Sequence, residues 1–211
     1  GWSVSLSADG TRVAIGARFN DGNGNYAGHV RIYEYSAGSW TQLGADIDGE
    51  AAVDQSGWSV SLSSDGSRVA IGARHNDGNG NDAGHTRIYE YSAGSWTQLG
   101  ADIDSEAASD ESGFSVSLSS DGSRVAIGAY LNDGNGTDAG HVRIYEYSAG
   151  SWTQLGVDID GEAAEDRSGR SVSLSADATR VAIGASLNDG NGNYAGHVRV
   201  YSICFDTIQQ Q

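Results

Sequence analysis

The chain of 211 residues contains no lysine, no methionine and no proline, and its one cysteine is Cys204. A single cysteine excludes a disulfide within the chain. No apolar run approaches the roughly 20 residues that a membrane-spanning helix needs, so we expect no membrane insertion. Without proline, the turns must depend on the 31 glycines and on asparagine and aspartate, which also tolerate turn conformations.

A secretory signal peptide is also absent, and the first residue already lies inside a repeated unit. We therefore expect the chain to be a fragment or a mature piece of a longer protein. The missing signal consequently does not argue against secretion.

The lack of lysine leaves 12 arginines against 28 acidic residues and a formal net charge of −16. Nucleic acid is disfavoured as a partner, because phosphate binding needs a basic surface. The acidity suits cation binding or solubility in a salty extracellular setting, and it would also keep repetitive strands of different molecules apart. We expect an extracellular or cell-surface protein.

The chain does have a unit of 56 residues that recurs almost unchanged. Its opening, Gly-Trp-Ser-Val at residues 1–4, returns with small changes from residues 57, 113 and 169, and the first two units agree at 48 of 56 positions. Such a chain is an array of one supersecondary unit. We expect a single repeat domain over residues 1–211, with units at 1–56, 57–112, 113–168 and 169–211.

Each unit predicts four short strands. Large apolar and small polar side chains alternate at the start of the unit, which is the period of a strand. An Asp-Gly turn, a loop rich in glycine and asparagine, and a glycine turn then separate three further strand patterns, and an acidic connector follows. In the first unit the four strands are expected at residues 2–7, 12–17, 28–35 and 39–44.

The alternation of bulky and tiny side chains predicts how these strands pack. In a β-propeller each sheet is covered on both faces, and the inner strand lies near a crowded axis, so one face must be small. Ser3, Ser5, Ala14 and Gly16 would supply that face. We predict an all-β fold, a β-propeller of four tandem four-stranded blades that form a closed four-bladed ring or part of a larger ring.

The fourth unit departs from the repeated pattern after Tyr201. Its last ten residues are expected to form a modified outer strand or a terminal cap, because end repeats are often atypical.

Three segments of each unit carry a resemblance to a known family. In the first unit they are Gly-Trp-Ser-Val at 1–4, Val-Ala-Ile-Gly-Ala at 13–17 and Gly-His-Val-Arg-Ile-Tyr at 28–33. In this order they resemble the FG-GAP repeats of integrin-α-type β-propellers. The resemblance implies a propeller whose blades serve extracellular adhesion or recognition, often with calcium bound in loops.

The chain departs from that family between the first two strands, where the family has its calcium loop. Here there is only a short turn, Ser-Asp-Gly-Ser at residues 64–67 in the second unit. The resemblance therefore supports the fold more strongly than it supports the family's metal site.

A different calcium pattern occurs in the loop between the second and third strands. Asp-Gly-Asn-Gly-Asn places oxygen ligands at positions 1, 3 and 5, which is the spacing of calcium-binding loops. Position 12 lacks the usual glutamate, and the alternative is a tight surface loop of residues that tolerate positive φ. The candidate calcium ligands are Asp21, Asn23, Asn25, Asp77, Asn79, Asn81, Asp133, Asn135, Thr137, Asp189, Asn191 and Asn193.

Two further repeated sets are weaker metal candidates. Alternate carboxylates in the connector can gather a cation, pair with arginines or stay solvated. Histidines at the entry to the third strand would bind a metal if they converged on the propeller axis, although a hydrogen bond to a nearby carboxylate or carbonyl is the simpler role. The sets are Asp46, Asp48, Glu50 and Asp54 with their equivalents, and His29, His85, His141 and His197.

Aromatic residues recur at two places in the unit. Trp40, Trp96 and Trp152 in the fourth strand are the candidate ligand-binding residues, because exposed aromatic rings stack on sugars and repeated copies add avidity. Packing between blades is the alternative for them. It is also the alternative for the second set, Trp2, Trp58 and Phe114, which open the first strand.

No Ser-His-Asp, Cys-His or paired-carboxylate arrangement stands out from the repeats, so we predict that the chain is not an enzyme. We expect a noncatalytic extracellular adhesion or recognition propeller that binds a protein or carbohydrate ligand multivalently. The alternative is a structural subunit of an extracellular fibre, coat or surface layer, in which blades of different copies pack together.

Overall fold

The computed structural model describes residues 1–204 and 207–210, and these residues form β-strands, turns and loops without any helix. The prediction of an all-β chain is therefore confirmed for the described part. Phe205, Asp206 and Gln211, which belong to the divergent last segment, lie outside the described residues.

Four antiparallel sheets follow one another along the chain. The first sheet has the order β1-β2-β3-β4, and β5 pairs with the beginning of β3. Its strands are β1 (Ser3–Leu6), β2 (Arg12–Ala17), β3 (His29–Ser36), β4 (Ser39–Gln42) and β5 (Ile47–Asp48). The second sheet has β6 (Ser59–Leu62), β7 (Arg68–Ala73), β8 (His85–Ser92), β9 (Ser95–Gln98) and β10 (Ile103–Asp104).

The third sheet repeats this arrangement, and the fourth ends differently. The third has β11 (Ser115–Leu118), β12 (Arg124–Ala129), β13 (His141–Ser148), β14 (Ser151–Gln154) and β15 (Ile159–Asp160). The fourth has β16 (Ser168–Leu174), β17 (Arg180–Ala185), β18 (His197–Cys204) and β19 (Thr207–Gln210). Because β19 pairs with β18, the divergent segment supplies an outer strand.

The short fifth strand is a feature that the sequence pattern did not predict. The long strand β3 pairs with β4 along its second half, where Tyr35 faces Trp40, and with β5 along its first half, where His29 faces Asp48. Gly44, at a φ of 75°, lies in the segment between β4 and β5. The beginning of the acidic connector is therefore part of the sheet.

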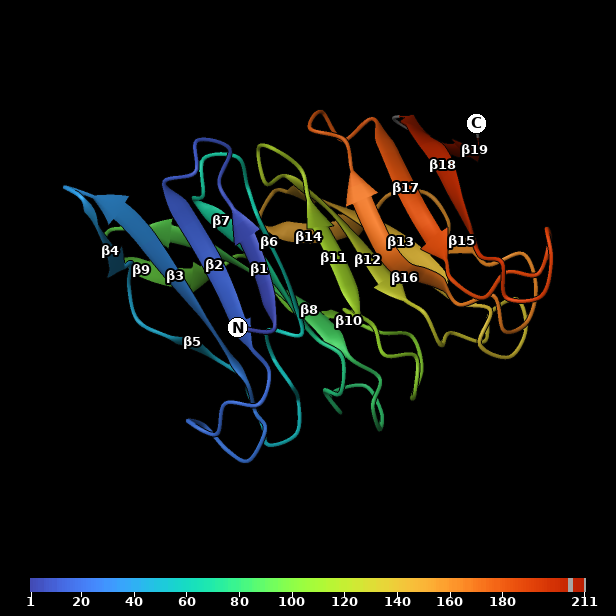
Figure 1. Cartoon of the computed structure of the whole chain (residues 1–211), viewed down its shortest axis with the longest axis horizontal. Helices are drawn as coiled ribbons and strands as arrows, with labels where there is room; N and C mark the ends of the chain where they lie inside the picture. The colour runs from blue at the N-terminus through green and yellow to red at the C-terminus, as the bar shows by residue number, and fades with distance from the viewer. Residues whose placement is uncertain (205–206, 211) are drawn as a thin grey trace.

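The sheets lie side by side in chain order, from the N-terminal sheet at one end of the molecule to the C-terminal sheet at the other (Figure 1). Their first strands β1, β6, β11 and β16 are consecutive neighbours. Val4 and Leu6 on β1 are 69% and 59% exposed, whereas the equivalent Val60 and Leu62 on β6 are 9% and 7% exposed. A ring closed by four blades is therefore not seen.

The core consists of three apolar clusters, one between each pair of successive sheets. Each cluster joins two facing sides of successive sheets. We call the side of a sheet that packs on the next sheet along the chain its trailing face, and the side that packs on the previous sheet its leading face. Between the first two sheets, the trailing face contributes Ala14, Val30, Ile32 and Ile47, and the leading face contributes Val60, Leu62, Val69 and Ile71.

Small residues allow the backbones of successive sheets to approach closely. A Cβ atom at Gly16 would lie 2.1 Å from the carbonyl oxygen of Gly57. The Ser3 hydroxyl donates to that same oxygen at 2.8 Å, and the Ser5 hydroxyl accepts a hydrogen bond from the amide of Leu62 at 2.9 Å. The small face predicted from the alternation is thus where neighbouring blades meet.

Candidate functional site

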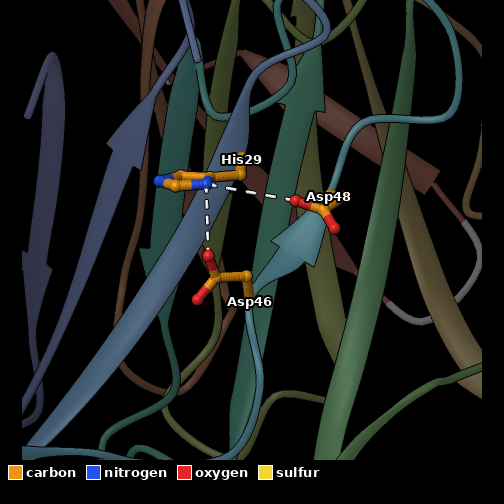
Figure 2. Close-up of side chains that lie close together, drawn as sticks. All are labelled: His29, Asp46 and Asp48. Atoms are coloured by element: carbon orange, nitrogen blue, oxygen red, sulfur yellow. Dashed lines mark ion pairs between the residues drawn. The ribbon is translucent and has the colours of Figure 1, made fainter. Parts of the chain in front are cut away.

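Each of the first three sheets brings the histidine at the start of its third strand beside carboxylates of a connector. In the first sheet, the pairing of β3 with β5 places His29 opposite Asp48. Figure 2 shows both aspartates beside the imidazole, with Nδ1 of His29 3.5 Å from Asp46 Oδ2 and 4.0 Å from Asp48 Oδ1. The histidines therefore meet the connector carboxylates rather than one another on the axis.

Two equivalent clusters span the junction between successive sheets. His85 Nδ1 lies 3.7 Å from Asp102 Oδ2 of its own sheet and 3.9 Å from Glu50 Oε2, which comes from the connector of the first sheet. His141 repeats these distances with Asp158 and Glu106. In each cluster the three ligand atoms lie within 4.8 Å of one another, so these residues could hold a metal ion. The sequence showed the two residue sets but not that they meet.

An arginine flanks each cluster. Arg87 lies with Nη1 3.2 Å from Glu50 Oε1 and donates from Nη2 to the carbonyl oxygen of Asp48 at 2.8 Å. In the first sheet, where the described structure has no glutamate of another connector beside the histidine, Arg31 instead makes a two-pronged contact with Asp46 at 2.9 and 2.8 Å. The preceding blade therefore decides which carboxylate the arginine meets.

The electrostatics keep the buried histidines neutral. Burial, reinforced by the neighbouring arginine, lowers the pKa of both His85 and His141 to about 4. Burial raises the pKa of Glu106, and the charge of Asp158 adds to that rise. At neutral pH each cluster therefore presents an uncharged imidazole beside carboxylates that repel one another.

The predicted calcium loops lie elsewhere, at the edge of the sheets between the second and third strands. Asp21 accepts a hydrogen bond from the amide of Tyr26 at 2.7 Å, and the Asn23 side chain donates to the carbonyl oxygen of Gly49 at 2.7 Å. The same bonds recur in the second and third units. These side chains brace the loop against its connector, and calcium binding by them stays a prediction.

Two of the three candidate ligand-binding tryptophans take part in blade packing. The indole nitrogens of Trp96 and Trp152 donate to the carbonyl oxygens of Leu43 and Leu99 in the preceding sheet, at 2.8 and 2.7 Å. Trp40, in the first sheet, is 47% exposed. Ligand binding by these residues stays a prediction, and Trp40 is the most accessible of them.

The other aromatic set forms a row along the starts of the first strands. The ring centroids of Trp2 and Trp58 are 5.1 Å apart, and those of Trp58 and Phe114 are 5.2 Å apart. The guanidinium of Arg18 lies 3.8 Å from the ring centroid of Trp2 and 4.3 Å from that of Trp58, within the range of cation–π attraction. This row joins blades, as the packing alternative expected.

The described residues include no helix of the length and apolarity needed to cross a membrane. By sequence, no curated protein matches the chain.

Among solved structures, a protein of Bacteroides uniformis ATCC 8492 provisionally named a 6-phosphogluconolactonase superposes with a TM-score of 0.65 at 12% identity. The superposition covers 99% of this chain and 52% of the other.

Two further solved structures give the same result. Hydrazine synthase of Kuenenia stuttgartiensis superposes with a TM-score of 0.58 at 14% identity, over 95% of this chain and 52% of the other. A protein of Agrobacterium tumefaciens provisionally named TolB gives 0.56 at 11% identity, over 99% and 60%. The chain thus spans about half the length of these proteins, and at such identities the similarity concerns the β-propeller-like fold alone.

A family comparison agrees with the repeats seen in the sequence and in the sheets. The model of the FG-GAP repeat matches residues 45–89 and 103–145. Each segment contains connector residues, the first two strands of the next sheet and the start of its third strand. These two segments of the chain are FG-GAP-like repeats, as the resemblance in the sequence predicted.

Proposed function

We propose that the chain is a noncatalytic extracellular recognition module that binds a protein or carbohydrate ligand with a cationic surface. One observation carries this proposal: the carboxylates of Asp21, Asp77, Asp133 and Asp189 are exposed, and they occupy the same position in four sheets that lie side by side. We call the loops that hold them, residues 18–28, 74–84, 130–140 and 186–196, the acidic loop edge.

The loops of the acidic loop edge have a defined shape before they meet a ligand. Each of the four aspartates accepts a hydrogen bond from the backbone amide five residues later. Little conformational entropy then remains to be lost on binding. Four such loops in fixed positions would turn weak single contacts into strong combined binding, with gains of about 10² to 10⁴ in apparent affinity.

The test compares two fourfold variants that change the net charge equally. The first neutralises the acidic loop edge with Asp21→Asn, Asp77→Asn, Asp133→Asn and Asp189→Asn, which keep an oxygen acceptor for the loop amide. Its matched control carries Asp9→Asn, Asp65→Asn, Asp121→Asn and Asp177→Asn in the turns at the opposite ends of the strands. There the wild-type carboxylates likewise accept backbone hydrogen bonds.

Binding is measured by biolayer interferometry against a panel of purified matrix proteins and glycans, in calcium and in EGTA. We expect the loop variant to lose about 100-fold in apparent affinity, following the loss of multivalency, while the turn variant stays near wild type. Equal losses of affinity in both variants would mean that the change in net charge, and not the acidic loop edge itself, weakens binding. Binding that is unchanged by EGTA would show that the recognition does not need calcium in these loops.

A second candidate function is favoured by the exposed ends of the array. Val4 and Leu6 on the leading face of the first sheet, and Val198 on the trailing face of the fourth, are exposed, although their equivalents in the interior sheets form the blade junctions. Head-to-tail packing of a second copy would bury both faces. The chain would then be a building block of an extracellular fibre or coat.

Light scattering across a range of concentrations tests this second candidate. If copies assemble, the mass of the wild-type chain should grow with concentration. The variant that combines Leu6→Asp with Val198→Asp should stay a monomer at every concentration. A wild-type chain that stays monomeric would contradict self-assembly while leaving the recognition function intact.

A further inference from the structure

We propose that Glu106, His141 and Asp158 bind a divalent transition-metal ion such as Zn²⁺ at the junction of the second and third sheets. Glu50, His85 and Asp102 form a second copy of this site at the preceding junction. This inference is independent of the recognition function, because the clusters lie at the blade junctions and not in the acidic loop edge.

The strongest indication is a buried nitrogen without a partner. His141 is 1% exposed, and its Nδ1 has no hydrogen-bond partner among the residues that the structure describes. A buried polar atom without a partner destabilises the folded chain. This nitrogen is directed at two carboxylate oxygens, 3.7 Å away on Asp158 and 3.9 Å away on Glu106, too far for hydrogen bonds.

These separations are close to those of atoms that share one metal ion. Zinc binds nitrogen and carboxylate oxygen at about 2.0–2.2 Å, so tetrahedral ligands lie roughly 3.3–3.6 Å from one another. A contraction of a few tenths of an ångström would bring each carboxylate oxygen to this distance from the imidazole nitrogen, and all three atoms already lie within 4.8 Å of one another. Glu106 is well placed to make this adjustment, since its side chain is partly exposed on a connector.

The charges around the site also favour a cation. Glu106 and Asp158 place two carboxylate groups beside the same imidazole nitrogen, so their negative charges are concentrated at one point. The nearest positive group is Arg143, whose Nη1 is 3.6 Å from Glu106 Oε1 and whose Nη2 donates to the carbonyl oxygen of Asp104 at 2.7 Å. Arg143 therefore offsets one of two carboxylates, and water would complete the coordination of an ion bound between them.

The donor set indicates the class of metal. Calcium and magnesium prefer ligand sets composed of oxygen atoms, whereas imidazole nitrogen suits zinc and its neighbours in the first transition row. Each proposed site draws one ligand from the connector of one sheet and two from the next sheet. A bound ion would therefore hold consecutive blades together.

The fourth unit provides a matched control within the chain. His197 lies 3.6 Å from Glu162 of the preceding connector, but no second carboxylate joins this pair in the part of the chain that the structure describes. His197 is thus a histidine at the same repeat position with an incomplete set of ligands. The first unit differs in another way, because its cluster of His29, Asp46 and Asp48 lies within one sheet and contains no glutamate from another connector.

Zinc titration of the EDTA-treated chain by isothermal calorimetry tests the proposal. Compared with the wild type, the Glu106→Gln variant should bind one fewer zinc ion at the strong sites. The variant that combines Glu50→Gln with Glu106→Gln should bind two fewer, and the control His197→Gln should bind the same number as the wild type. We expect the affinity of an altered site to fall at least 100-fold, since one of three ligands is lost. Both glutamates are partly exposed, so these variants should fold, which far-ultraviolet circular dichroism checks.

Two further readouts make the test decisive. Zinc should raise the melting temperature of the wild type and leave that of the double glutamine variant unchanged, and X-ray absorption should show nitrogen in the zinc shell that His85→Gln combined with His141→Gln removes. Equal stoichiometry in the wild type and the double glutamine variant would overturn the proposal. So would binding of calcium in preference to zinc at these residues.

Discussion

Replacement of Gly72 by alanine is expected to lower the free energy of unfolding by about 3 kcal/mol, the upper part of the range for overpacked sites. Gly72 lies in β7 at the junction of the second and third sheets. An added Cβ would lie 2.0 Å from the carbonyl oxygen of Gly113 and 2.9 Å from its carbonyl carbon. Both atoms belong to the backbone, which cannot move aside as a flexible side chain can, so the two blades must separate locally.

The matched control for this change is Gly184→Ala, at the same repeat position in the fourth sheet. The nearest atom to a Cβ there is the hydroxyl oxygen of Ser171 at 2.4 Å, and no backbone of a following sheet is close in the described structure. A serine hydroxyl can rotate away, so we expect a loss below about 1 kcal/mol. Urea unfolding followed by tryptophan fluorescence measures both variants. Equal losses would show that Gly184 is covered by another blade in solution.

Leu62→Ala is expected to destabilise the chain by about 3 kcal/mol, in the middle of the range for a buried leucine. Leu62 is buried in the leading face of the second sheet, against Ile32 and Ile47 of the first. Removing its isobutyl group exposes part of that junction or leaves a cavity in it. Thermal or urea unfolding gives the change in stability directly.

Leu6→Ala makes the same chemical change at the same repeat position, on the uncovered leading face of the first sheet. In a monomeric solution it should change stability by less than about 0.5 kcal/mol, as for most surface substitutions. A loss comparable to that of Leu62→Ala would contradict the open arrangement. It would mean that another blade covers β1, and repeating the measurement at low protein concentration would reveal whether that blade comes from a second copy.

Within each sheet, most of the architecture could be predicted from the residues. Alternation of large and small side chains located the first two strands, and turn residues such as Asp9 and Gly10 located the hairpin between them. The two-residue strand β5 could not be found in this way. Two residues are too few for a period to be recognised, and the pairing of β5 depends on the long strand β3 beside it.

The candidate metal sites illustrate the same limit over longer distances. Histidines and connector carboxylates were each visible as repeated sets, but Glu50 and His85 are 35 positions apart and belong to different sheets. Their proximity depends on how one blade is placed against the next. Likewise, nothing in the pattern of β9 distinguished a tryptophan that binds a ligand from one, Trp96, whose indole nitrogen is bonded to the preceding blade.

By itself, the sequence determined the repeated unit, the longer strands, the alternating faces and the resemblance to FG-GAP repeats, because these depend on local periodicity and on motifs that a single unit contains. The tertiary structure alone decided that Val4 and Leu6 are exposed while Val60 and Leu62 are buried. Identical residues in identical local structure differ in this respect because burial is a property of the neighbouring blade. No sheet covers the leading face of the first sheet in the described structure, whereas the leading face of the second sheet packs on the first.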